Sequence, residues 1–334
     1  MTKTIAYLSA SPYSGSTLLA FLLNTHPQIV TIGHTTGWDF GANDAFPCSC
    51  GEPLAQCGFY REIAAAFRAQ GLPFSLRDFG TDYRLAASPR LNRLLTTNLS
   101  RLTSTRLERL RDGVVQRLPW IRGRLARQDR ANQTLIGTVL ARSGARVFVD
   151  NSHDPYRLRH LRRLAEFRLL PIHLVRDPRG VAYSNKRHKG WDVVLSSRLW
   201  LRRQADIVRI FREFPKTLRV YYDDLCDAPD PQLAAIHRFL GLDPQPFGGN
   251  FKAGEHHILG NDMRLLDGQV RSDSRWQSGL TPDEAAAVDR TLTALLARHP
   301  DPALAEVVQH FLQRIPASGG DAAQRLSDPA QSPR

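Results

Sequence analysis

Long apolar runs are missing from this sequence. No run approaches the ~18 apolar residues that a membrane-spanning helix needs. Near the N-terminus only Ile5 to Leu8 are apolar before serines and a proline follow, which is too short for the core of a signal peptide. These absences lead us to expect a cytoplasmic protein without a membrane span.

Acidic residues are few beside the basic ones. The 32 aspartates and glutamates face 45 lysines and arginines, which gives a net charge of +13 carried mostly by arginine. Such a balance is typical of proteins that bind nucleic acid, an anionic membrane surface or a multiply anionic small ligand. Arginines are dense between Arg84 and Arg130, but leucines recur there at helical spacing and favour solvated helix faces. We therefore expect no specific nucleic-acid partner, and the oligomeric state stays open.

Cysteine is also scarce. Cys48, Cys50 and Cys57 cluster in PCSCGEPLAQC, and Cys226 is distant in the chain. The C-x-C-x6-C spacing is a weak match to a zinc site, which uses four ligands, commonly with a C-x2-C pair, and no clear fourth partner is present. In a reducing cytoplasm the cluster is interpreted as reduced structural thiols, with a disulfide or a metal site as open alternatives.

Short apolar or β-branched segments followed by turn or capping residues predict five buried strands. Helical patterns separate most of them, and this alternation is typical of a parallel sheet covered on both faces. The sequence therefore predicts an α/β fold, a P-loop-like parallel sheet of about five strands flanked by helices. The predicted strands are Ile5–Ser9, Ile29–Ile32, Arg146–Asp150, Pro171–Val175 and Leu218–Tyr222.

A long segment between the second and third predicted strands has no strand signal. Residues 37–141 are predicted to form loops and helices, a large and mostly helical insertion that could serve as a lid or an acceptor pocket. We expect a single domain over residues 1–315. Residues 316–334 are rich in Ser, Gly, Asp, Gln and Pro, which predicts a disordered tail.

The first predicted strand leads through Ser-Pro-Tyr-Ser-Gly-Ser-Thr into an apolar helix. Free backbone N–H groups and the helix dipole favour an anion where Ser14–Thr17 open that helix. A Walker loop carries a lysine that reaches the β- and γ-phosphates, and Ser16 stands in its place here. Binding of a triphosphate with magnesium is disfavoured, whereas a single phosphate or a phosphosulfate fits. An ordinary N-capped helix is the alternative for this motif alone.

Other polar residues follow the remaining predicted strands. His34 follows the second strand, His153 the third and Arg176 the fourth, with Ser184 two helical turns beyond Arg176. The carboxyl ends of parallel strands meet at one edge of the sheet, where ligands bind. Arg176 and Ser184 therefore add anion donors at the edge that carries the Ser14–Thr17 loop.

These segments together resemble the sulfotransferase family that uses 3′-phosphoadenosine-5′-phosphosulfate (PAPS), and its bacterial members most. SPYSGSTLL resembles the family's 5′-phosphosulfate loop, and Arg176 with Ser184 resembles its 3′-phosphate element. VDNSHDP resembles a segment that many relatives place before that element. VYYDDL resembles a strand end whose tyrosine, here Tyr222, lies near the adenine. HHILGNDMRLL, which includes Arg264, resembles a late loop that closes on the cofactor.

The resemblance implies that PAPS is the sulfuryl donor and that no metal is required. A hydroxyl or amine of a small-molecule acceptor would attack the sulfur in line. The protein would position the partners, take the acceptor proton and stabilise charge on the leaving phosphate. The residues expected to hold the cofactor are Ser14, Gly15, Ser16, Thr17, Arg176, Ser184, Tyr222 and Arg264.

Three positions depart from the pattern of common relatives. Tyr13 stands where the family often has Arg or Lys, His34 where many relatives have a glutamate base, and His153 where many have Lys. His34 can serve as the base, because an unperturbed imidazole titrates near neutrality. A protonated His153 could replace the charge of a lysine, and Tyr13 could donate one hydrogen bond. These three are the expected catalytic residues.

Two other functions remain open from the sequence. One is a phosphotransferase with a degenerate P-loop, which predicts magnesium-dependent ATP binding. The other is a non-enzymatic binder of a nucleotide or polyanion, which predicts a steep salt dependence of binding.

Overall fold

The structure is a computed structural model that describes residues 2–40, 45–96, 105–265 and 267–313. The predicted tail at 316–334 lies outside these residues. The chain divides into two compact units, 1–176 with 202–272 and 177–201 with 273–334. The expectation of one domain over 1–315 stays a prediction. None of the helices in the described ranges combines the length and the low polarity that a bilayer crossing requires.

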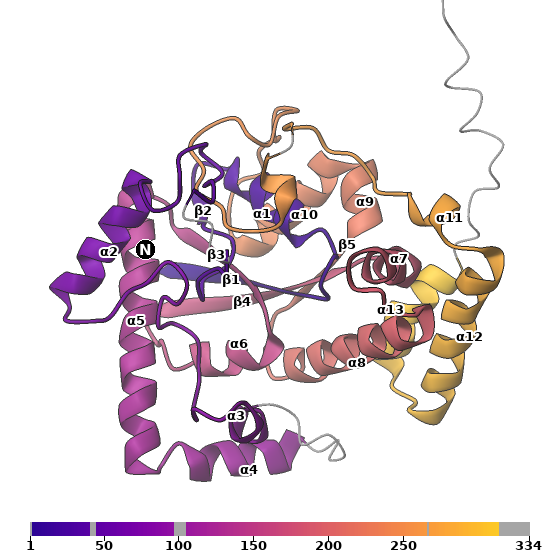
Figure 1. Cartoon of the computed structure of the whole chain (residues 1–334), viewed down its shortest axis with the longest axis horizontal. Helices are drawn as coiled ribbons and strands as arrows, with labels where there is room; N and C mark the ends of the chain where they lie inside the picture. Colours follow the sequence, from indigo (N-terminus) through magenta and orange to yellow (C-terminus); the bar gives the residue numbers. More distant parts are fainter. Residues whose placement is uncertain (1, 41–44, 97–104, 266, 314–334) are drawn as a thin grey trace, which may run out of the picture. The chain divides into compact units, whose positions relative to one another are not determined.

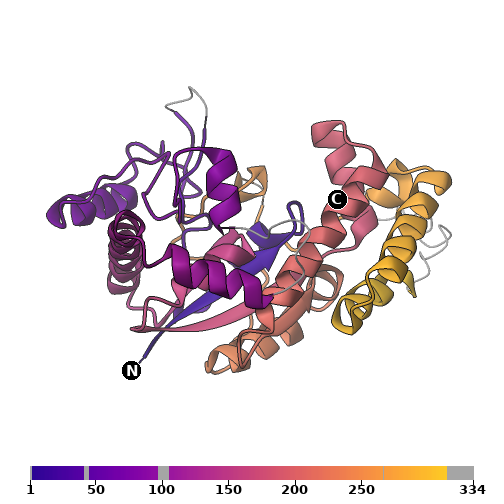
Figure 2. The ribbon, with the colours of Figure 1, turned by 90° about the horizontal axis from the view of Figure 1, so that it is seen from below.

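The first unit is built on a sheet of five parallel strands in the order β2-β3-β1-β4-β5 (Figure 1). All five predicted strands are present, and the predicted α/β fold is confirmed. β1 lies in the centre, and Figure 2 shows it running beside β4. The strands are β1 (Lys3–Ala10), β2 (Ile29–Thr31), β3 (Val147–His153), β4 (Phe167–Val175) and β5 (Leu218–Tyr221).

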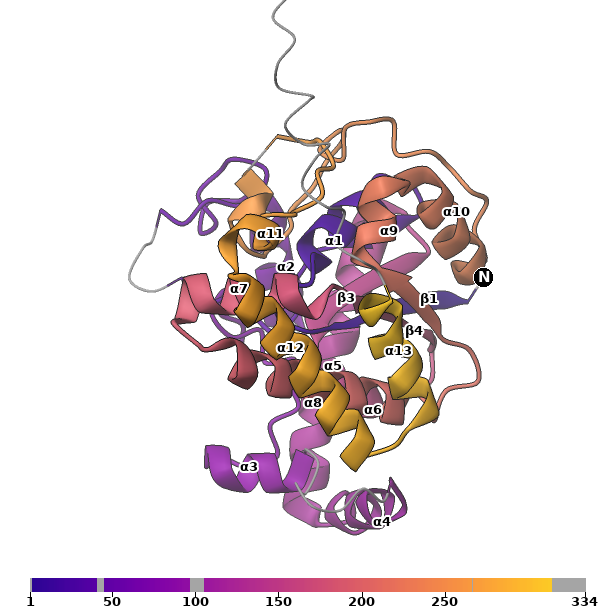
Figure 3. The same ribbon diagram turned by 90° about the vertical axis from the view of Figure 1, so that its right-hand side faces the viewer.

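Both faces of the sheet are buried by helices. Ile5 and Tyr7 of β1 point into one apolar cluster, whereas Ala6 and Leu8 point into the other, as the two-residue period of a strand requires. Figures 1 and 3 show α1, α9 and α10 on one face and α6 on the opposite face. These helices are α1 (Ser16–Asn24), α6 (Pro155–Leu161), α9 (Tyr222–Asp227) and α10 (Pro229–Leu240). Buried side chains on both faces explain the continuous apolar runs of the strands.

The described part of the segment at 37–141 consists of helices and the loops between them. Four helices lie in its described part, and α5 packs against the edge of the sheet through residues such as Leu135 and Val139. α3 and α4 lie by the end of α5 that is remote from the sheet (Figures 1 and 3). The helices are α2 (Gly58–Ala69), α3 (Pro89–Thr96), α4 (Thr105–Val115) and α5 (Pro119–Ser143).

The described residues of the second unit form helices and the loops between them. It contains α7 (Pro178–Lys189), α11 (Trp276–Gly279), α12 (Pro282–Arg298) and α13 (Pro302–Leu312). α8 (Val193–Phe211) belongs to both units, because the division falls within it. Within the second unit, Arg179 of α7 pairs with Asp289 of α12 at 3.0 Å and donates to the carbonyl of Phe311.

The helix starts follow their local sequence. α6 and α7 both open on Asp-Pro, and the aspartates accept hydrogen bonds from the amides of Tyr156 and Arg179. Proline suits the first helical position because it has no N–H to leave unsatisfied. α12 begins with the predicted capping box of Thr281 and Glu284. The caps of α6 and α7 fix the points at which the chain passes from β3 and β4 into the helices that follow them.

Candidate functional site

The loop between β1 and α1 turns sharply at two left-handed residues. Tyr13 has φ 62° and Gly15 has φ 82°. For a tyrosine this backbone conformation is uncommon, and such strain is held only where the surroundings fix it. Here the carbonyl of Tyr13 accepts a hydrogen bond of 2.7 Å from Arg176 Nη1. Burial raises the pKa of the Tyr13 phenol, so the side chain stays a neutral hydrogen-bond donor.

The start of α1 has the features of an anion site. Gly15 is its N-cap and supplies no side-chain cap, and no acidic residue lies in the first turn. The first amides of a helix have no acceptor within the helix. Ser14, Ser16 and Thr17 are buried, and the Ser14 hydroxyl has no hydrogen-bond partner among the residues that the structure describes. A buried hydroxyl without a partner is costly, so this turn is suited to an anionic ligand.

Gly15 lies against the ring of Tyr222, the residue that begins α9. A Cβ atom built on Gly15 would come within 2.2 Å of the Tyr222 ring. Two independent constraints therefore require glycine at this position, namely the positive φ angle and the close approach of the ring. Tyr222 therefore lies beside the loop, and its expected role at the adenine stays a prediction.

Replacing Gly15 with alanine is expected to destabilise the protein. Gly144, the C-cap of α5, is a matched control because it has φ 68° but nothing within 4 Å of a built Cβ. Gly144→Ala should cost only the ~1–2 kcal/mol of a left-handed alanine, and Gly15→Ala should cost more. Thermal or urea unfolding measures both variants.

A double variant tests the reason for that difference. Gly15→Ala should cost less in a Tyr222→Ala background, because the ring that it would clash with is gone. An equal cost in both backgrounds would contradict the contact between Gly15 and Tyr222.

Arg176 contacts both Tyr13 in the loop after β1 and Tyr222 at the start of α9. It follows β4 directly, is buried, donates to Tyr13, and its guanidinium carbon lies 4.9 Å from the centre of the Tyr222 ring. The loop after β1, the end of β4 and the start of α9 therefore meet at one edge of the sheet.

Ser184 belongs to the second unit and is described within it. It is buried in α7, and its hydroxyl donates to the carbonyl of Gly180, one turn earlier, at 3.0 Å. To donate to a phosphate, the hydroxyl would have to leave this bond. Its place in a 3′-phosphate site stays a prediction.

Arg264 contacts the loop before Cys48. It lies in the short 3-10 helix η1 (Asp262–Leu265), with its guanidinium 4.3 Å from the centre of the Phe46 ring. It donates to the carbonyls of Gly260 and Pro47 at 3.2 and 3.4 Å. These contacts tie η1 to the loop before Cys48, and the expected contact with the nucleotide stays a prediction.

His34 and His153 lie side by side at the ends of neighbouring strands. Their ring centres are 5.3 Å apart, and the ring of Trp38 lies 4.8 Å from His34. His153 Nε2 lies 2.8 Å from the side-chain oxygen of Asn151, whose amide nitrogen lies 3.3 Å from the carbonyl of Ser16. A chain of polar contacts therefore leads from the first turn of α1 to the histidine pair.

Burial keeps both histidines neutral near pH 7. It lowers the pKa of His34, although Asp150 raises that pKa in part. Burial lowers the pKa of His153 to about 3, and the neighbouring His34 and Arg203 add to the effect. The lowered pKa of His153 gives no support to the expectation that a protonated His153 replaces a lysine charge. A neutral His34 remains suited to accept a proton.

A buried network below the histidines escaped the sequence analysis. Asp150 of β3 pairs with Arg157 of α6 at 3.2 Å and accepts a hydrogen bond of 2.9 Å from Thr35, which follows His34. Arg157 also donates to Asn132 and to the carbonyl of Thr81, both at 2.6 Å. The network fixes the backbone next to both histidines. An arginine in a helical pattern gave no signal of this role.

One cluster could hold a metal ion. The sulfurs of Cys48, Cys50 and Cys57 and a ring nitrogen of His257 all lie within 4.8 Å of one another. The sequence analysis found no fourth ligand because His257 lies 200 residues after Cys57. The expectation that no metal is present therefore has no support from the structure.

One family profile matches part of the chain. The profile described as the sulfotransferase family matches residues 85–246, a range that contains β3, β4, β5, Arg176 and Tyr222. Over this range, just under half of its length, the chain is similar to the sulfotransferase family. The loop at Ser14–Thr17 lies before the matched range, so the profile says nothing about that loop. No curated protein sequence matches the chain.

Several solved sulfotransferase structures are similar to this chain at low identity. The sulfotransferase domain of the Synechococcus PCC 7002 olefin synthase is 20% identical over 94% of this chain and 96% of its own, with a TM-score of 0.44. The sulfotransferase domain from the curacin biosynthetic pathway is 16% identical over 88% and 98%, with a TM-score of 0.48. A Mycobacterium tuberculosis H37Rv sulfotransferase is 18% identical over 88% and 77%, with a TM-score of 0.41. No residue role is transferred from these three structures.

Proposed function

We propose that the chain transfers a sulfuryl group from PAPS to a hydroxyl or amine of a small-molecule acceptor. The observation that carries this proposal is the hydrogen bond from Arg176 to Tyr13, which brings an arginine against the turn that opens α1. Guanidinium groups and helix N-termini both bind phosphate oxygens. Two anion-binding elements at one sheet edge suit a nucleotide that carries a phosphate at each end.

The first turn of α1 would hold the 5′-phosphosulfate. The buried Ser14 hydroxyl and the backbone amides of Ser16 and Thr17 are the donors available there. These donors would also stabilise the charge that gathers on the phosphate as it leaves. No lysine is needed, because PAPS has no β- or γ-phosphate. Arg176 would bind the 3′-phosphate, and the ring of Tyr222 beside it offers a face for the adenine.

His34 is the proposed base. The acceptor oxygen or nitrogen forms a bond to sulfur, the bond from sulfur to the 5′-phosphate oxygen breaks, and the acceptor proton passes to His34. Burial favours the neutral imidazole that this step needs. Asn151 and His153 would orient the site as neutral polar groups, since His153 carries no charge near pH 7.

A polar pocket of about 440 Å³ lies between α3 and α6 and is a candidate for the acceptor. Asp154 and Arg157, which follow His153 closely, line one side of it, and Tyr83 and Arg93 line the other. Its mixed charges suit a polar or anionic acceptor. The insertion at 37–141 would then supply acceptor specificity, because most of the lining comes from residues 82–96.

Ligand-induced thermal shifts test the proposal against its alternatives. Adenosine 3′,5′-bisphosphate, the product left by PAPS, should raise the melting temperature without magnesium. A shift by ATP that requires magnesium would instead support a phosphotransferase. Equal shifts by any polyanion, abolished by moderate salt, would support a non-enzymatic binder. Incubation with labelled PAPS and a cell extract, followed by identification of the labelled product, would reveal the acceptor.

A further inference from the structure

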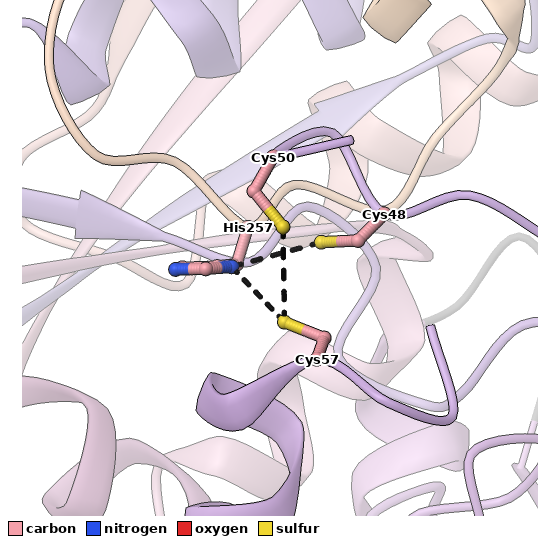
Figure 4. A group of neighbouring side chains, drawn as sticks. All are labelled: Cys48, Cys50, Cys57 and His257. Carbon is pink, nitrogen blue, oxygen red and sulfur yellow. Dashed lines mark hydrogen bonds between the residues drawn. The ribbon is translucent and has the colours of Figure 1, made fainter. Parts of the chain in front are cut away.

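The Cys48–Cys50–Cys57–His257 cluster lies apart from the residues assigned to sulfuryl transfer. Cys48 and Cys50 come from the loop before α2, Cys57 is the N-cap of α2, and His257 comes from the segment before η1. Figure 4 shows the three sulfurs and one edge of the imidazole pointing toward a common centre. All three cysteines are free thiols.

We propose that this cluster is a structural zinc site with three thiolate ligands and one imidazole ligand. Zinc binds such sets tetrahedrally, with Zn–S near 2.3 Å and Zn–N near 2.0 Å, so that neighbouring ligand atoms lie ~3.5–3.8 Å apart. The Cys50 and Cys57 sulfurs are 3.9 Å apart. His257 Nδ1 lies 3.6 Å from the Cys48 sulfur and 3.3 Å from the Cys57 sulfur. These three distances are close to those of a tetrahedral zinc site, and all four ligand atoms lie within 4.8 Å of one another.

The surroundings of His257 are those of a metal-bound imidazole. Its other ring nitrogen, Nε2, lies 2.8 Å from the Glu255 carboxylate, which in turn accepts a hydrogen bond of 2.9 Å from Arg142. A carboxylate that takes the proton on Nε2 leaves a lone pair on Nδ1, the atom that faces the sulfurs. The ring of Phe59 stacks on the imidazole at 4.3 Å and fixes its plane.

The helix that begins after Cys57 favours a charged sulfur. Cys57 is the N-cap of α2, where the free amides and the positive end of the helix dipole stabilise negative charge. On binding, each thiol would release its proton to solvent and each sulfur would donate a lone pair to the ion.

The kind and number of the ligand atoms indicate which metal binds and what it does. Three sulfurs and one nitrogen in tetrahedral array favour zinc over the oxygen-preferring magnesium and calcium ions. Four protein ligands leave no open position for water or substrate, so the site is structural and not catalytic. It does not depend on the proposed sulfuryl transfer.

A bound zinc ion would connect two segments that are distant in the chain, the loop before α2 and the segment before η1. Ser49, between two of the cysteines, accepts a hydrogen bond from the amide of Ile258 at 2.7 Å. The next residue, Leu259, pairs with the end of β2, donating to Ile32 at 2.8 Å and accepting from the amide of His34 at 3.3 Å. Metal binding would therefore hold the segment that borders the backbone of His34.

Metal analysis of the full chain tests the site directly. Protein purified without a chelator or a polyhistidine tag should contain about one zinc per chain by mass spectrometry of the metals. Cys50→Ser is the first variant, because Cys50 is exposed and its loss disturbs packing least. It should lose most of the zinc. Cys226→Ser is the matched control, since Cys226 lies outside the cluster, and it should keep its zinc.

Cobalt provides a readout that does not depend on the variants. Refolding the wild-type chain with Co²⁺ should give the thiolate-to-metal charge-transfer absorption and the intense visible bands of a tetrahedral site. Folded wild-type protein without zinc and without these bands would overturn the proposal. So would zinc that survives Cys50→Ser and Cys57→Ser, or a metal-free protein in which Cys50 and Cys57 form a disulfide.

Discussion

Arg176→Ala is expected to abolish most of the thermal shift that adenosine 3′,5′-bisphosphate gives the wild-type protein. Arg176 is buried at the end of β4 and touches both Tyr13 and Tyr222. Removing a charged hydrogen-bond donor from a phosphate typically costs roughly 1.5–3 kcal/mol, which is about 10- to 100-fold in affinity. Titration calorimetry would measure that loss in solution.

The control for Arg176→Ala is an arginine of β4, the strand that precedes Arg176. Arg168 is exposed near the opposite end of β4, so Arg168→Ala should leave bisphosphate binding unchanged. Adenosine 5′-phosphate, which lacks the 3′-phosphate, separates a lost contact from a disturbed loop. Its affinity should fall much less than that of the bisphosphate in Arg176→Ala. An equal fall for both nucleotides would assign Arg176 to the loop structure alone.

His34→Ala is expected to lower kcat by about 10²- to 10⁴-fold, the usual contribution of a general base, while the affinity for the bisphosphate stays nearly intact. His34 borders His153 and Trp38 and is not among the proposed phosphate contacts. His299→Ala, at an exposed histidine after α12, is the matched control and should keep full turnover. Unchanged turnover in His34→Ala would show that His34 is not the base and that another residue takes the acceptor proton.

The pH profile of the wild-type enzyme gives an independent test of His34. Burial lowers the pKa of His34 below its ordinary value, so the base is neutral at pH 7 and becomes protonated only in acid. Turnover should therefore fall as the pH drops, with a midpoint below ~6.5. His34→Ala should lack this acid limb. A limb that persists in the variant would contradict the assignment.

Much of the sheet was predictable because the strands are buried on both faces. Residues such as Ile5 and Leu8 then form short apolar runs, and the polar residues that follow each run mark the edge where ligands bind. The loop at Ser14–Thr17 and Arg176 were recognisable for the same reason. Their mutual contact follows from β1 and β4 being neighbours, which sequence order alone does not state.

The features that the sequence concealed depend on long-range pairing or on burial. His257 is 200 residues from Cys57 in the chain, so no local spacing connects them. Arg157 looks like any arginine of a helical pattern until Asp150 is placed beside it. The charge expected on His153 gains no support, because the pKa of a histidine depends on the burial of its ring, which a motif does not reveal.

A structure of the protein with adenosine 3′,5′-bisphosphate bound tests the central claim most directly. The account predicts the 5′-phosphate on the amides of Ser16 and Thr17 and the Ser14 hydroxyl, and the 3′-phosphate against the Arg176 guanidinium. A nucleotide bound away from this edge of the sheet, or one whose two phosphates contact neither the loop nor Arg176, would contradict it.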